Sequence, residues 1–524
     1  MLSDKNKGTK PDTTMEEGTF YMAESTGAIN LDPLHAFTSK DAQFYTAFYE
    51  GLVTYHPFYL SPVPGVARRW EISKDKKVYT FYLRENALFN NGEPVLAEDF
   101  RNSWLRVLDP KEKAEYSIYF DIIKGAYDYR TGESTDPNTV GIKVISDHVL
   151  EIELEKPASH LLKLLCHMTF VPVYSGYLKK INWSNDTSLV SNGPYNYFRK
   201  NNNEIILIKN NLYWNSNNIE IEKIHVYQSD DLEEVTQMFN EQKLHWAASF
   251  DFTKVQNKNY ITSFPSFSLK FYFFKTNTPP WDDYRIRRGL SMLLPWSEIR
   301  PESDYFYAET IIPAISGYPK QKGITQNEEE GLKLLSEAGF PGGKGLPQIV
   351  IKIGDGNSED EDITKIMKAT WGEKLGLDVK VVKVGNQNFY DELKKKDYTL
   401  GTMIWIGDYA DPLSMLQIWS SDSNLNDAKF LDAHFDDLID KAMSTEDEEE
   451  RYKIMSEAEK VLLEKAVILP VRQHPSLNLI NDDLIAGWYP NLLDIHPFLY
   501  LRFRENILPE GVVFTPPIKW FFPS

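Results

Sequence analysis

Cysteine is almost missing from this sequence of 524 residues, which contains only Cys166. An intrachain disulfide bond is therefore impossible, and both a multi-cysteine metal site and a CxxC redox motif are excluded. The shortage leaves the cellular compartment open, because many exported bacterial proteins also lack disulfide bonds.

Long apolar runs are missing too. A membrane-spanning helix needs about 20 predominantly apolar residues, and the longest candidate, around residues 161–174, is interrupted by a lysine, a histidine and a proline. Residues 3–18 are polar and lack the apolar centre of a signal peptide. We therefore expect a soluble chain from which any export signal has been removed. We expect residues 1–17 to be flexible, either as the tether of a lipoprotein or as a frayed terminus.

Basic residues are fewer than acidic ones: the sequence has 57 Lys and Arg residues against 76 Asp and Glu residues, and its formal net charge is -19. Nucleic-acid binding draws much of its affinity from basic side chains that neutralise phosphates. We therefore expect neither nucleic acid nor an anionic membrane surface as a partner.

Common catalytic and metal-binding motifs do not occur. The sequence holds no HExxH, GxSxG or GxGxxG, and its ten histidines form no i, i+4 pair of the kind that a helical zinc site uses. Residues 339–345 (GFPGGKG) approach a phosphate loop, but two of its required residues are missing, and a helix end with a Gly/Pro turn explains the segment. We expect no enzyme, no metal and no cofactor.

Apolar and aromatic residues, by contrast, are plentiful: 42% of the chain is hydrophobic, with 29 Tyr, 29 Phe and 12 Trp. This composition indicates folded domains, and the length predicts about three domains or lobes. Strand and helix patterns alternate, which predicts a mixed α/β fold. The clearest strands are expected at 78–84, 149–155 and 379–384, and the clearest helices at 97–108, 283–294 and 363–375.

Short motifs follow one another along the chain in a characteristic order. They are LDP (31–33), FYEGL (48–52), PGVA (64–67), NGEP (91–94), NGPY (192–195), NLYWN (211–215), DYRIR (283–287), LLSEAGF (334–340), WGEKLG (371–376) and GDYADP (407–412). In this order and spacing the chain, from about Gly18 to Phe503, closely resembles the oligopeptide- and dipeptide-binding proteins of ATP-binding-cassette (ABC) importers, family 5 of the extracellular solute-binding proteins.

The resemblance implies a two-lobed fold of the periplasmic-binding-protein type (type II, large cluster), in which an extra subdomain is inserted in lobe I. The ligand then lies between the lobes and is enclosed by hinge closure. The implied division is lobe I at 18–53, 175–268 and 476–505, inserted subdomain at 54–174, lobe II at 269–475 and C-terminal extension at 506–524.

Asp408 is the first candidate for ligand binding, because it falls where peptide-binding members place the aspartate that pairs with the ligand's α-ammonium group. A buried ammonium group needs such a counter-charge. The resemblance also makes residues 398–406 a binding strand, whose Ile404 and Ile406 offer backbone groups to the peptide while Trp405 forms a wall. Tyr409 follows Asp408 directly. A turn aspartate and a core tryptophan are the alternatives.

Further positions of this sequence align with cleft positions of the family. They are Asp41, Tyr116, His167, Trp246, Phe273 and His474. A packed structural role is the alternative for all of them except Asp41, for which a solvated helix surface is the alternative.

The sequence departs from the family pattern in four places. Thr402 replaces an arginine that meets the peptide's C-terminal carboxylate in a well-known oligopeptide binder, and residues 243–246 (KLHW) replace an acidic motif. These departures leave the preferred peptide length open. Residues 295–313 form a shorter segment than usual, and residues 506–524 are additional.

The implied function is that of a monomeric receptor at the bacterial cell envelope, periplasmic or lipid-anchored, which captures short peptides with a free amino terminus and delivers them to the permease of an ABC importer. Two alternatives stay open. One is the same fold with another solute, such as an oligosaccharide, an opine or a nickel complex. The other is an adhesin or signalling receptor that uses the hydrophobic C-terminal extension for a protein contact.

Overall fold

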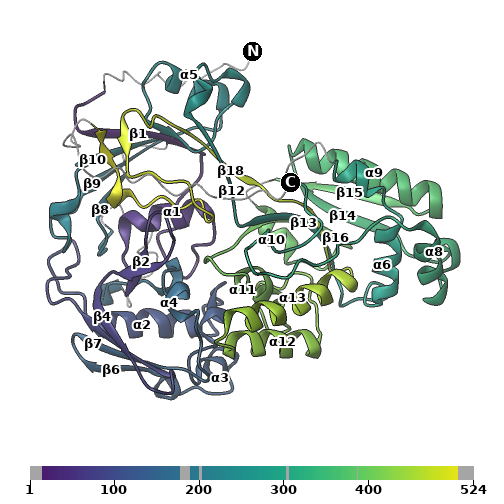
Figure 1. Cartoon of the computed structure of the whole chain (residues 1–524), viewed down its shortest axis with the longest axis horizontal. Helices are drawn as coiled ribbons and strands as arrows, with labels where there is room; N and C mark the ends of the chain where they lie inside the picture. The colour runs from purple at the N-terminus through teal and green to yellow at the C-terminus, as the bar shows by residue number, and fades with distance from the viewer. Residues whose placement is uncertain (1–14, 178–188, 200–202, 302–305, 386–387, 505–524) are drawn as a thin grey trace, which may run out of the picture.

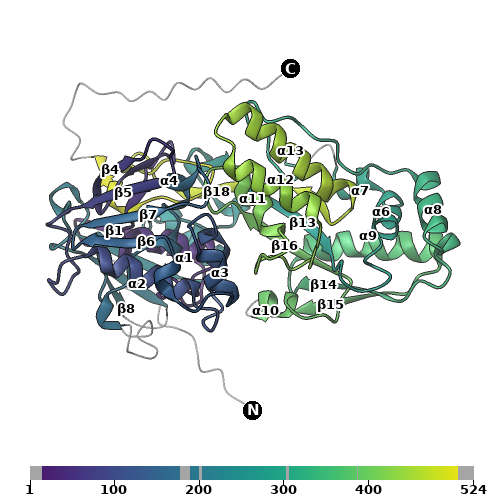
Figure 2. The same ribbon diagram turned by 90° about the horizontal axis from the view of Figure 1, so that it is seen from below.

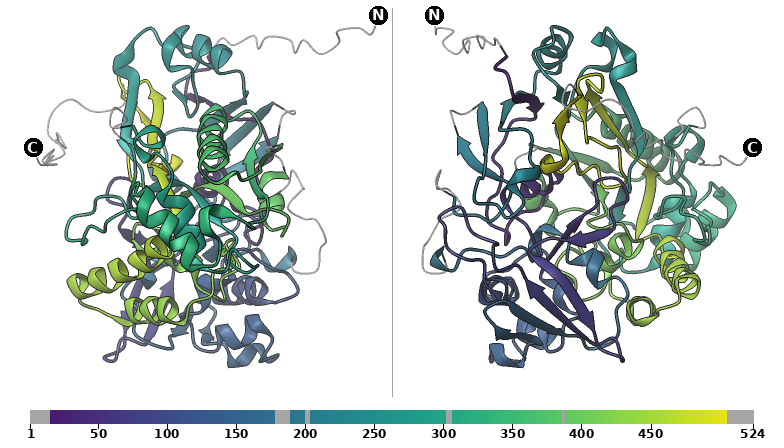
Figure 3. Two further views of the ribbon diagram at one scale, coloured as in Figure 1. Left: turned by 90° about the vertical axis from the view of Figure 1, so that its right-hand side faces the viewer. Right: turned by 60° about the vertical axis from the view of Figure 1, so that its left-hand side comes forward.

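The computed structural model describes residues 15–177, 189–199, 203–301, 306–385 and 388–504. The C-terminal extension and most of the expected tether lie outside the described residues. The described chain forms two lobes side by side (Figures 1 and 2), and its N-terminal and C-terminal parts both belong to the same lobe (Figure 3). No helix in this part of the chain is long and apolar enough to cross a membrane.

Lobe I is built on a sheet that has seven strands within the described ranges, in the order β12-β18-β11-β1-β10-β9-β8. The strands are β1 (Thr19–Glu24), β8 (Tyr195–Arg199), β9 (Glu204–Lys209), β10 (Lys223–Gln228), β11 (Trp246–Ala247), β12 (Ile261–Pro265) and β18 (Pro475–Ile480). Helix α1 (Ser39–Phe48) packs on this sheet through an edge-to-face contact between Phe48 and Tyr197 of β8. Helix α5 (Leu232–Asn240) and the short pair β19 (Ile485–Ala486) and β20 (Arg502–Phe503) complete the lobe.

The range expected for the inserted subdomain, 54–174, begins within the hairpin of β2 (Val53–Tyr55) and β3 (Pro62–Pro64). Its antiparallel sheet has the order β4-β5-β7-β6, formed by β4 (Ala67–Ile72), β5 (Val78–Leu83), β6 (Ile142–Ser146) and β7 (Val149–Glu153). Its helices are α2 (Ala97–Leu108), α3 (Ala126–Thr131) and α4 (Leu161–Leu164). The buried Trp104 of α2 donates its indole N–H to the carbonyl oxygen of Phe170 at 3.0 Å, and so ties α2 to the segment that carries His167.

Lobe II contains a sheet of five described strands in the order β15-β14-β16-β13-β17. They are β13 (Ser268–Phe274), β14 (Ile349–Gly354), β15 (Val379–Val384), β16 (Leu400–Ile406) and β17 (Ile468–Arg472). The helices are α6 (Tyr284–Met292), α7 (Trp296–Ile299), α8 (Glu328–Glu337), α9 (Ser358–Leu375), α10 (Phe389–Leu393), α11 (Leu413–Leu416), α12 (Ala433–Ser444) and α13 (Glu448–Glu464). Trp371 of α9 donates its indole N–H to the carbonyl oxygen of Leu290 in α6 at 2.9 Å.

Two extended chain segments cross between the lobes. Strand β12 of lobe I leads into β13 of lobe II, and β17 of lobe II leads back into β18 of lobe I (Figure 1). The two crossings are tied together, because the carbonyl oxygen of His474 accepts hydrogen bonds from the hydroxyls of Ser266 and Ser268. A connection of two paired strands allows the lobes to rotate while the strands stay continuous.

The strands and helices expected from the sequence are confirmed, with small shifts at their ends. Helix α9 begins five residues before the expected start at 363, because the side chain of Asn357 caps it by accepting a hydrogen bond from the amide of Asp360. The strands of the three large sheets fall in the ranges expected for lobe I, the inserted subdomain and lobe II, except that β13 begins one residue early, at Ser268, and β18 begins one residue early, at Pro475. The exact lobe boundaries stay predictions.

A buried carboxyl group anchors part of the segment that is shorter than usual. Glu459 of α13 is 1% exposed, and its Oε1 accepts hydrogen bonds from the amides of Ile311 and Ile312 at 2.7 and 3.0 Å. Burial raises the pKa of Glu459 to about 7, although these two hydrogen bonds act to lower it. In the folded protein, the carboxyl group of Glu459 is therefore mostly protonated at slightly acidic pH.

This group makes stability depend on pH in a definite direction. Because the pKa of Glu459 is higher in the folded chain than its ordinary value of 4.5, its contribution is fully present below about pH 4.5 and is lost as the pH rises through about 7, up to roughly 3 kcal/mol at ~1.4 kcal/mol per pH unit. Glu459→Gln, which is neutral at every pH, should lose less stability between pH 5 and pH 8 than the wild type in urea unfolding. Glu457→Gln, at an exposed position of the same helix, is the control, and equal pH dependence of all three proteins would contradict the assignment.

Candidate functional site

A cavity of about 240 Å³ lies between lobe I, the inserted subdomain and lobe II. Its walls come from α1 and the turn before it, from β2, from the segment 166–171, from the end of β16 and from two residues near the C-terminal end of lobe I. The lining residues are Phe37, Thr38, Ser39, Ala42, Tyr45, Thr46, Tyr49, Gly51, Val53, Thr54, Tyr55, Tyr116, Cys166, His167, Met168, Val171, Tyr390, Ile404, Trp405, Ile406, Gly407, Asp408, Leu493 and Ile495. Of the candidates, the cavity brings together Ile404, Trp405, Ile406, Asp408, Tyr116 and His167.

Strand β16 reaches the cavity with one edge unpaired. It pairs with β13 along its whole length, from Leu400 to Ile406, but β14 pairs only with its first two residues. Between Thr402 and Ile406, no strand of the described chain occupies the other edge. The backbone groups of this edge are therefore free to pair with an extended ligand.

The turn after β16 depends on a glycine. The amide of Gly407 donates to the carbonyl oxygen of Phe267 at 2.7 Å, which brings the two backbones close together. A Cβ atom at position 407 would lie only 2.2 Å from the ring of Phe267. This close packing sets the direction in which the chain presents Asp408.

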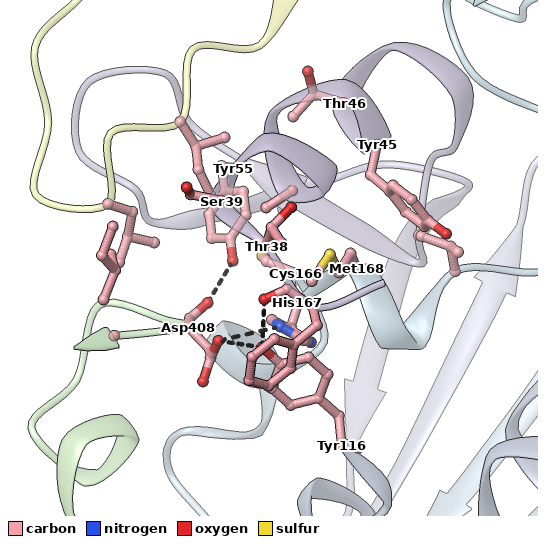
Figure 4. Close-up of a pocket in the computed structure, with 18 of the residues that line it drawn as sticks. Thr38, Ser39, Tyr45, Thr46, Tyr55, Tyr116, Cys166, His167, Met168 and Asp408 are labelled. Carbon is pink, nitrogen blue, oxygen red and sulfur yellow. Dashed lines mark hydrogen bonds and ion pairs between the residues drawn. The ribbon is translucent and has the colours of Figure 1, made fainter. Parts of the chain in front are cut away.

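The carboxylate of Asp408 is held from across the seam between the lobes. Tyr116 donates its hydroxyl to Oδ1 at 3.1 Å, Tyr119 donates to Oδ2, and Nε2 of His167 lies 3.6 Å from Oδ1. The backbone carbonyl oxygen of Asp408 accepts a hydrogen bond from the hydroxyl of Tyr55 at 3.3 Å. Figure 4 shows Tyr55, Tyr116 and His167 around Asp408, whose side chain is only 9% exposed.

The protonation states around Asp408 follow from burial. Burial, and secondly the negative charge of Asp408, raise the pKa of both Tyr116 and Tyr119 well above the ordinary tyrosine value. Both hydroxyls therefore keep their protons and donate. Nδ1 of His167 accepts a hydrogen bond from the amide of Thr169 at 3.3 Å, so that a neutral imidazole carries its proton on Nε2, the nitrogen that faces Asp408.

Among the described residues, no lysine or arginine of the cavity lining compensates the charge of Asp408. Of the nearby cations, Arg106 forms two hydrogen bonds with Asp32, and Lys163 lies 3.7 Å from the carboxylate of Asp411. A charge that is largely removed from water without a counter-charge is costly, so the cavity is suited to a ligand that brings a cation.

Aromatic rings form the wall beside Asp408. Phe37 stacks on Tyr116 and makes edge contacts with Tyr390 and Trp405, with ring centroids 5.4–6.0 Å apart. Trp405 is 6% exposed and donates its indole N–H to the carbonyl oxygen of Ser414 at 3.3 Å. Trp405 therefore packs in the core and also forms part of the cavity wall. The sequence analysis had offered these two roles as alternatives.

Asp41 is not on a solvated helix surface, and that alternative is wrong. It is 4% exposed, and its carboxylate accepts hydrogen bonds from the backbone amides of Asn30, Phe37 and Thr38. Together with the side chain of Thr38 it forms the capping box at the start of α1. Asp41 does not line the cavity; it positions the helix whose residues do.

Four further candidates lie outside the cavity lining. Tyr409 is fully buried behind Asp408, in edge contact with Tyr119. Phe273 is buried beside Tyr398 and Trp419 in lobe II. Trp246 donates its indole N–H to Asn478 at 2.8 Å inside lobe I, and His474 stands at the crossing between β17 and β18. Ligand contact by these four stays a prediction.

Sequence reasoning missed several residues that line the cavity or contact Asp408. Tyr119, Tyr55 and Tyr45 were not among the candidates, although the first two contact Asp408 and the third lines the cavity. For Tyr119 a signal existed: Tyr116 precedes it by three residues, and in the short 3-10 helix at Ser117–Phe120 this spacing puts both side chains on one side.

The lobes contact each other around the cavity. The side-chain amide of Asn424 in lobe II donates to the carbonyl oxygen of Ala114 and to the hydroxyl of Ser117, at 3.2 and 2.8 Å. Arg130 of the inserted subdomain lies 3.3 Å from Asp422 of lobe II. These contacts, together with those of Asp408, define a closed arrangement.

Two lobes, two crossing strands and an enclosed cavity between them define a solute-binding protein. Residues 61–427, more than half of the chain, match the family model described as "Bacterial extracellular solute-binding proteins, family 5 Middle". The chain belongs to this family, which confirms the resemblance found in the sequence.

Similar proteins carry peptide-binding names. The dipeptide-binding protein DppE of Bacillus subtilis is 27% identical over 492 residues, which cover 90% of this chain and 89% of that protein. The periplasmic oligopeptide-binding protein OppA of Salmonella typhimurium is 28% identical over 462 residues, 82% of this chain and 81% of the relative. The structure of the Escherichia coli murein tripeptide binding protein MppA matches with a TM-score of 0.83 at 24% identity, over 94% of this chain and 99% of that one.

The unliganded open form of MppA matches less well, with a TM-score of 0.64 at 23% identity, over 93% of this chain and 98% of that one. Both structures carry the name MppA, and this chain superposes better on the first than on the open form. The arrangement of the lobes in this chain differs from that open form, in agreement with the contacts around the cavity.

We expect the turn at Gly407 to tolerate no side chain. Gly407→Ala places a methyl group against the ring of Phe267 and should lower the free energy of unfolding by about 1–3 kcal/mol, as overpacking does. Gly385→Ala is the matched control, because a Cβ atom there meets nothing within 4 Å, and its stability should stay within about 0.5 kcal/mol of the wild type. Urea unfolding of the three proteins measures this, and equal stability of both variants would contradict the packing argument.

Proposed function

We propose that this protein captures short peptides with a free amino terminus between its closing lobes and delivers them to the permease of an ABC-type importer. The observation that carries the proposal is the carboxylate of Asp408, which faces the interlobe cavity without a compensating lysine or arginine among the described lining residues. A peptide's ammonium group would supply the missing charge.

The hydrogen-bonding capacity of Asp408 supports an ammonium ligand. A carboxylate offers about four acceptor sites, and the hydroxyls of Tyr116 and Tyr119 occupy two of them. An ammonium group brings one charge and three donors, which suit the remaining acceptors and the hydroxyl oxygens nearby. A neutral sugar would leave the charge of Asp408 uncompensated, so the oligosaccharide alternative lacks this support.

The free edge of β16 supports an extended peptide. Peptide backbone would pair with the backbone between Thr402 and Ile406, where β14 no longer pairs. Binding through the main chain gives affinity without strict sequence preference. The names of DppE, OppA and MppA, which refer to dipeptides, oligopeptides and a murein tripeptide, agree with this ligand class.

The family is described as extracellular, and in this proposal the protein acts as a monomer at the bacterial cell envelope, in the periplasm or held by a lipid anchor outside the cytoplasmic membrane. It performs no chemistry on the peptide. Its work is capture, enclosure and presentation to the permease.

Asp408→Asn tests the central contact. The variant keeps the shape of the side chain but removes its charge, and truncation of one partner of a buried charge pair typically costs about 2–5 kcal/mol. The affinity for the tripeptide Leu-Ala-Ala should therefore fall by roughly 30-fold to several thousand-fold in calorimetric titration, at ~1.4 kcal/mol per decade. N-acetylation of the peptide should weaken binding to the wild type similarly and should change binding to the variant little.

Asp391→Asn is the control, because Asp391 lies beside the cavity residue Tyr390 but its own side chain is 81% exposed. It should change the affinity by less than about twofold, since exposed charges contribute little. Equal affinity of the wild type for free and acetylated peptide, after removal of any carried ligand, would rule out the ammonium contact.

The sole cysteine gives a readout of closure. Cys166 lines the cavity, and burial raises the pKa of its thiol, so it should react slowly with an aromatic disulfide reagent in the closed form. Saturating Leu-Ala-Ala should slow the reaction by roughly tenfold or more, because ligand shifts the population toward the closed form. N-acetyl-Leu-Ala-Ala at the same concentration is the control. Protection by neither peptide would contradict ligand-driven closure, and protection by both would contradict the requirement for a free amino terminus.

A further inference from the structure

Ion pairs between the inserted subdomain and lobe II are sorted by charge. Within the described chain, five pairs across this seam involve a lysine or an arginine, and in four of them the subdomain supplies the cation. These four are Lys76 with Glu446, Arg130 with Asp422, Lys156 with Asp440 and Lys163 with Asp411, at nitrogen-to-oxygen distances of 2.5, 3.3, 3.6 and 3.7 Å. The fifth, Glu115 with Lys394, has the opposite polarity. The two faces are therefore electrostatically complementary.

A second cavity, of about 700 Å³, lies on this seam between α3 and α12 (Figure 1). Carboxylates line it from both sides, among them Asp121 of the inserted subdomain and Asp436 of lobe II. Carboxylates that face each other repel. Arg130 offsets this repulsion, because it pairs with Asp121 on its own side and lies 3.3 Å from Asp422 on the other. The cations of the subdomain therefore allow two acidic surfaces to meet.

One of the four pairs reaches the turn that carries Asp408. Besides lying near Asp411, the ammonium group of Lys163 in α4 donates a hydrogen bond to the carbonyl oxygen of Ala410 at 3.4 Å. Asp411 is itself fixed inside lobe II, because the guanidinium group of Arg451 donates two hydrogen bonds of 2.7 Å to its carboxylate. The charged seam and the ligand cavity therefore share one segment of lobe II, residues 408–411.

Each of these pairs is weak by itself. The side chains of Lys76 and Glu446 are 56% and 47% exposed, and those of Lys156 and Asp440 are 60% and 62% exposed. An exposed ion pair shifts an equilibrium by only about 1.5- to 5-fold. The pairs form or break together when the lobes move as bodies, however, and the effects of separate sites multiply. Together they are large enough to decide between the closed and the open arrangement.

We propose that these four ion pairs form a latch, which favours the closed arrangement before any ligand is bound. A ligand that requires the closed form binds more tightly when this form is more populated in the free protein. The latch therefore raises the affinity for the ligand without touching it. The inference goes beyond the proposed function, because the latch acts on the ligand-free protein whatever the cavity takes.

Reversal of the charges tests the latch. One variant combines Lys76→Glu with Lys156→Glu, a second combines Asp440→Lys with Glu446→Lys, and a third carries all four substitutions. In either double variant, the thiol of Cys166 should react at least about threefold faster with an uncharged aromatic disulfide reagent in the absence of ligand, and the affinity for Leu-Ala-Ala should fall by about two- to tenfold. The fourfold variant, in which opposite charges face each other again, should return to within about twofold of the wild type.

Net charge cannot imitate this result, because the two double variants change it in opposite directions and should still act alike. Glu449→Lys combined with Glu457→Lys is the matched control. Both residues are exposed and pair with lysines inside α13, so the control alters the charge of lobe II as the second double variant does. It should leave the thiol rate and the affinity within about twofold of the wild type.

Thermal melts of the ligand-free proteins check that the variants are folded. Thiol rates and affinities that stay at the wild-type values in both double variants, or that stay changed in the fourfold variant, would overturn the latch. If Leu-Ala-Ala does not bind to the wild type, the proposed function fails, and the thiol rates of the ligand-free proteins still decide on the latch.

The wild type alone provides a test without any substitution. Its thiol rate, relative to that of free cysteine, should rise between 0.05 and 0.5 M NaCl, because salt screens exposed ion pairs. An unchanged or lower relative rate at high salt would contradict the latch.

Discussion

The carboxylate of Asp408 is the constraint on which the arrangement of the site depends. It belongs to lobe II, and the hydroxyls that hold it, those of Tyr116 and Tyr119, belong to the inserted subdomain. Contact between the lobes therefore buries the negative charge of Asp408 from two sides. No lysine or arginine among the described lining residues pairs with it. Hydroxyl donors stabilise the charge only in part. In the proposed function, a cationic group of the ligand would supply the missing positive charge, which would link binding of that ligand to closure of the lobes.

The scaffold serves this arrangement through two structural features. Strands β12–β13 and β17–β18 connect the lobes as a tied pair, so the lobes can move as bodies while Asp408 keeps its place at the end of β16. Gly407 allows the backbones of two segments to approach, and the resulting turn aims Asp408 into the cavity. The unpaired edge of β16 lies directly before this turn, which places main-chain pairing next to the charged contact.

Much of the fold could be predicted because its signals are local. The alternation of apolar and polar residues in VLEIELE (149–155) specifies a strand wherever one face is buried, and the motifs of the family specify the order of the elements. The start of α9 was missed because the cap at Asn357 precedes the apolar pattern. The motif GDYADP pointed to Asp408 through the family resemblance, and the structure places Asp408 in the cavity lining, while its contact with a ligand stays a prediction.

The tyrosine partners of Asp408 are harder to predict, because they lie 289 to 353 residues away from it in the chain. Nothing in the local sequence of Tyr119 or Tyr55 shows that lobe closure will bring them to lobe II. For Asp41 the sequence was misleading in the other direction. An acidic residue at the start of a helix is often exposed, but the carboxylate of Asp41 is buried because it accepts hydrogen bonds from three backbone amides.

A crystal structure of the protein with a bound peptide tests the central claim most directly. The account predicts closed lobes, an ammonium nitrogen about 2.7–3.2 Å from a carboxylate oxygen of Asp408, and a peptide backbone paired with the free edge of β16. A peptide bound with its carboxyl end or a neutral group at Asp408, or bound outside the cavity between the lobes, would contradict the account.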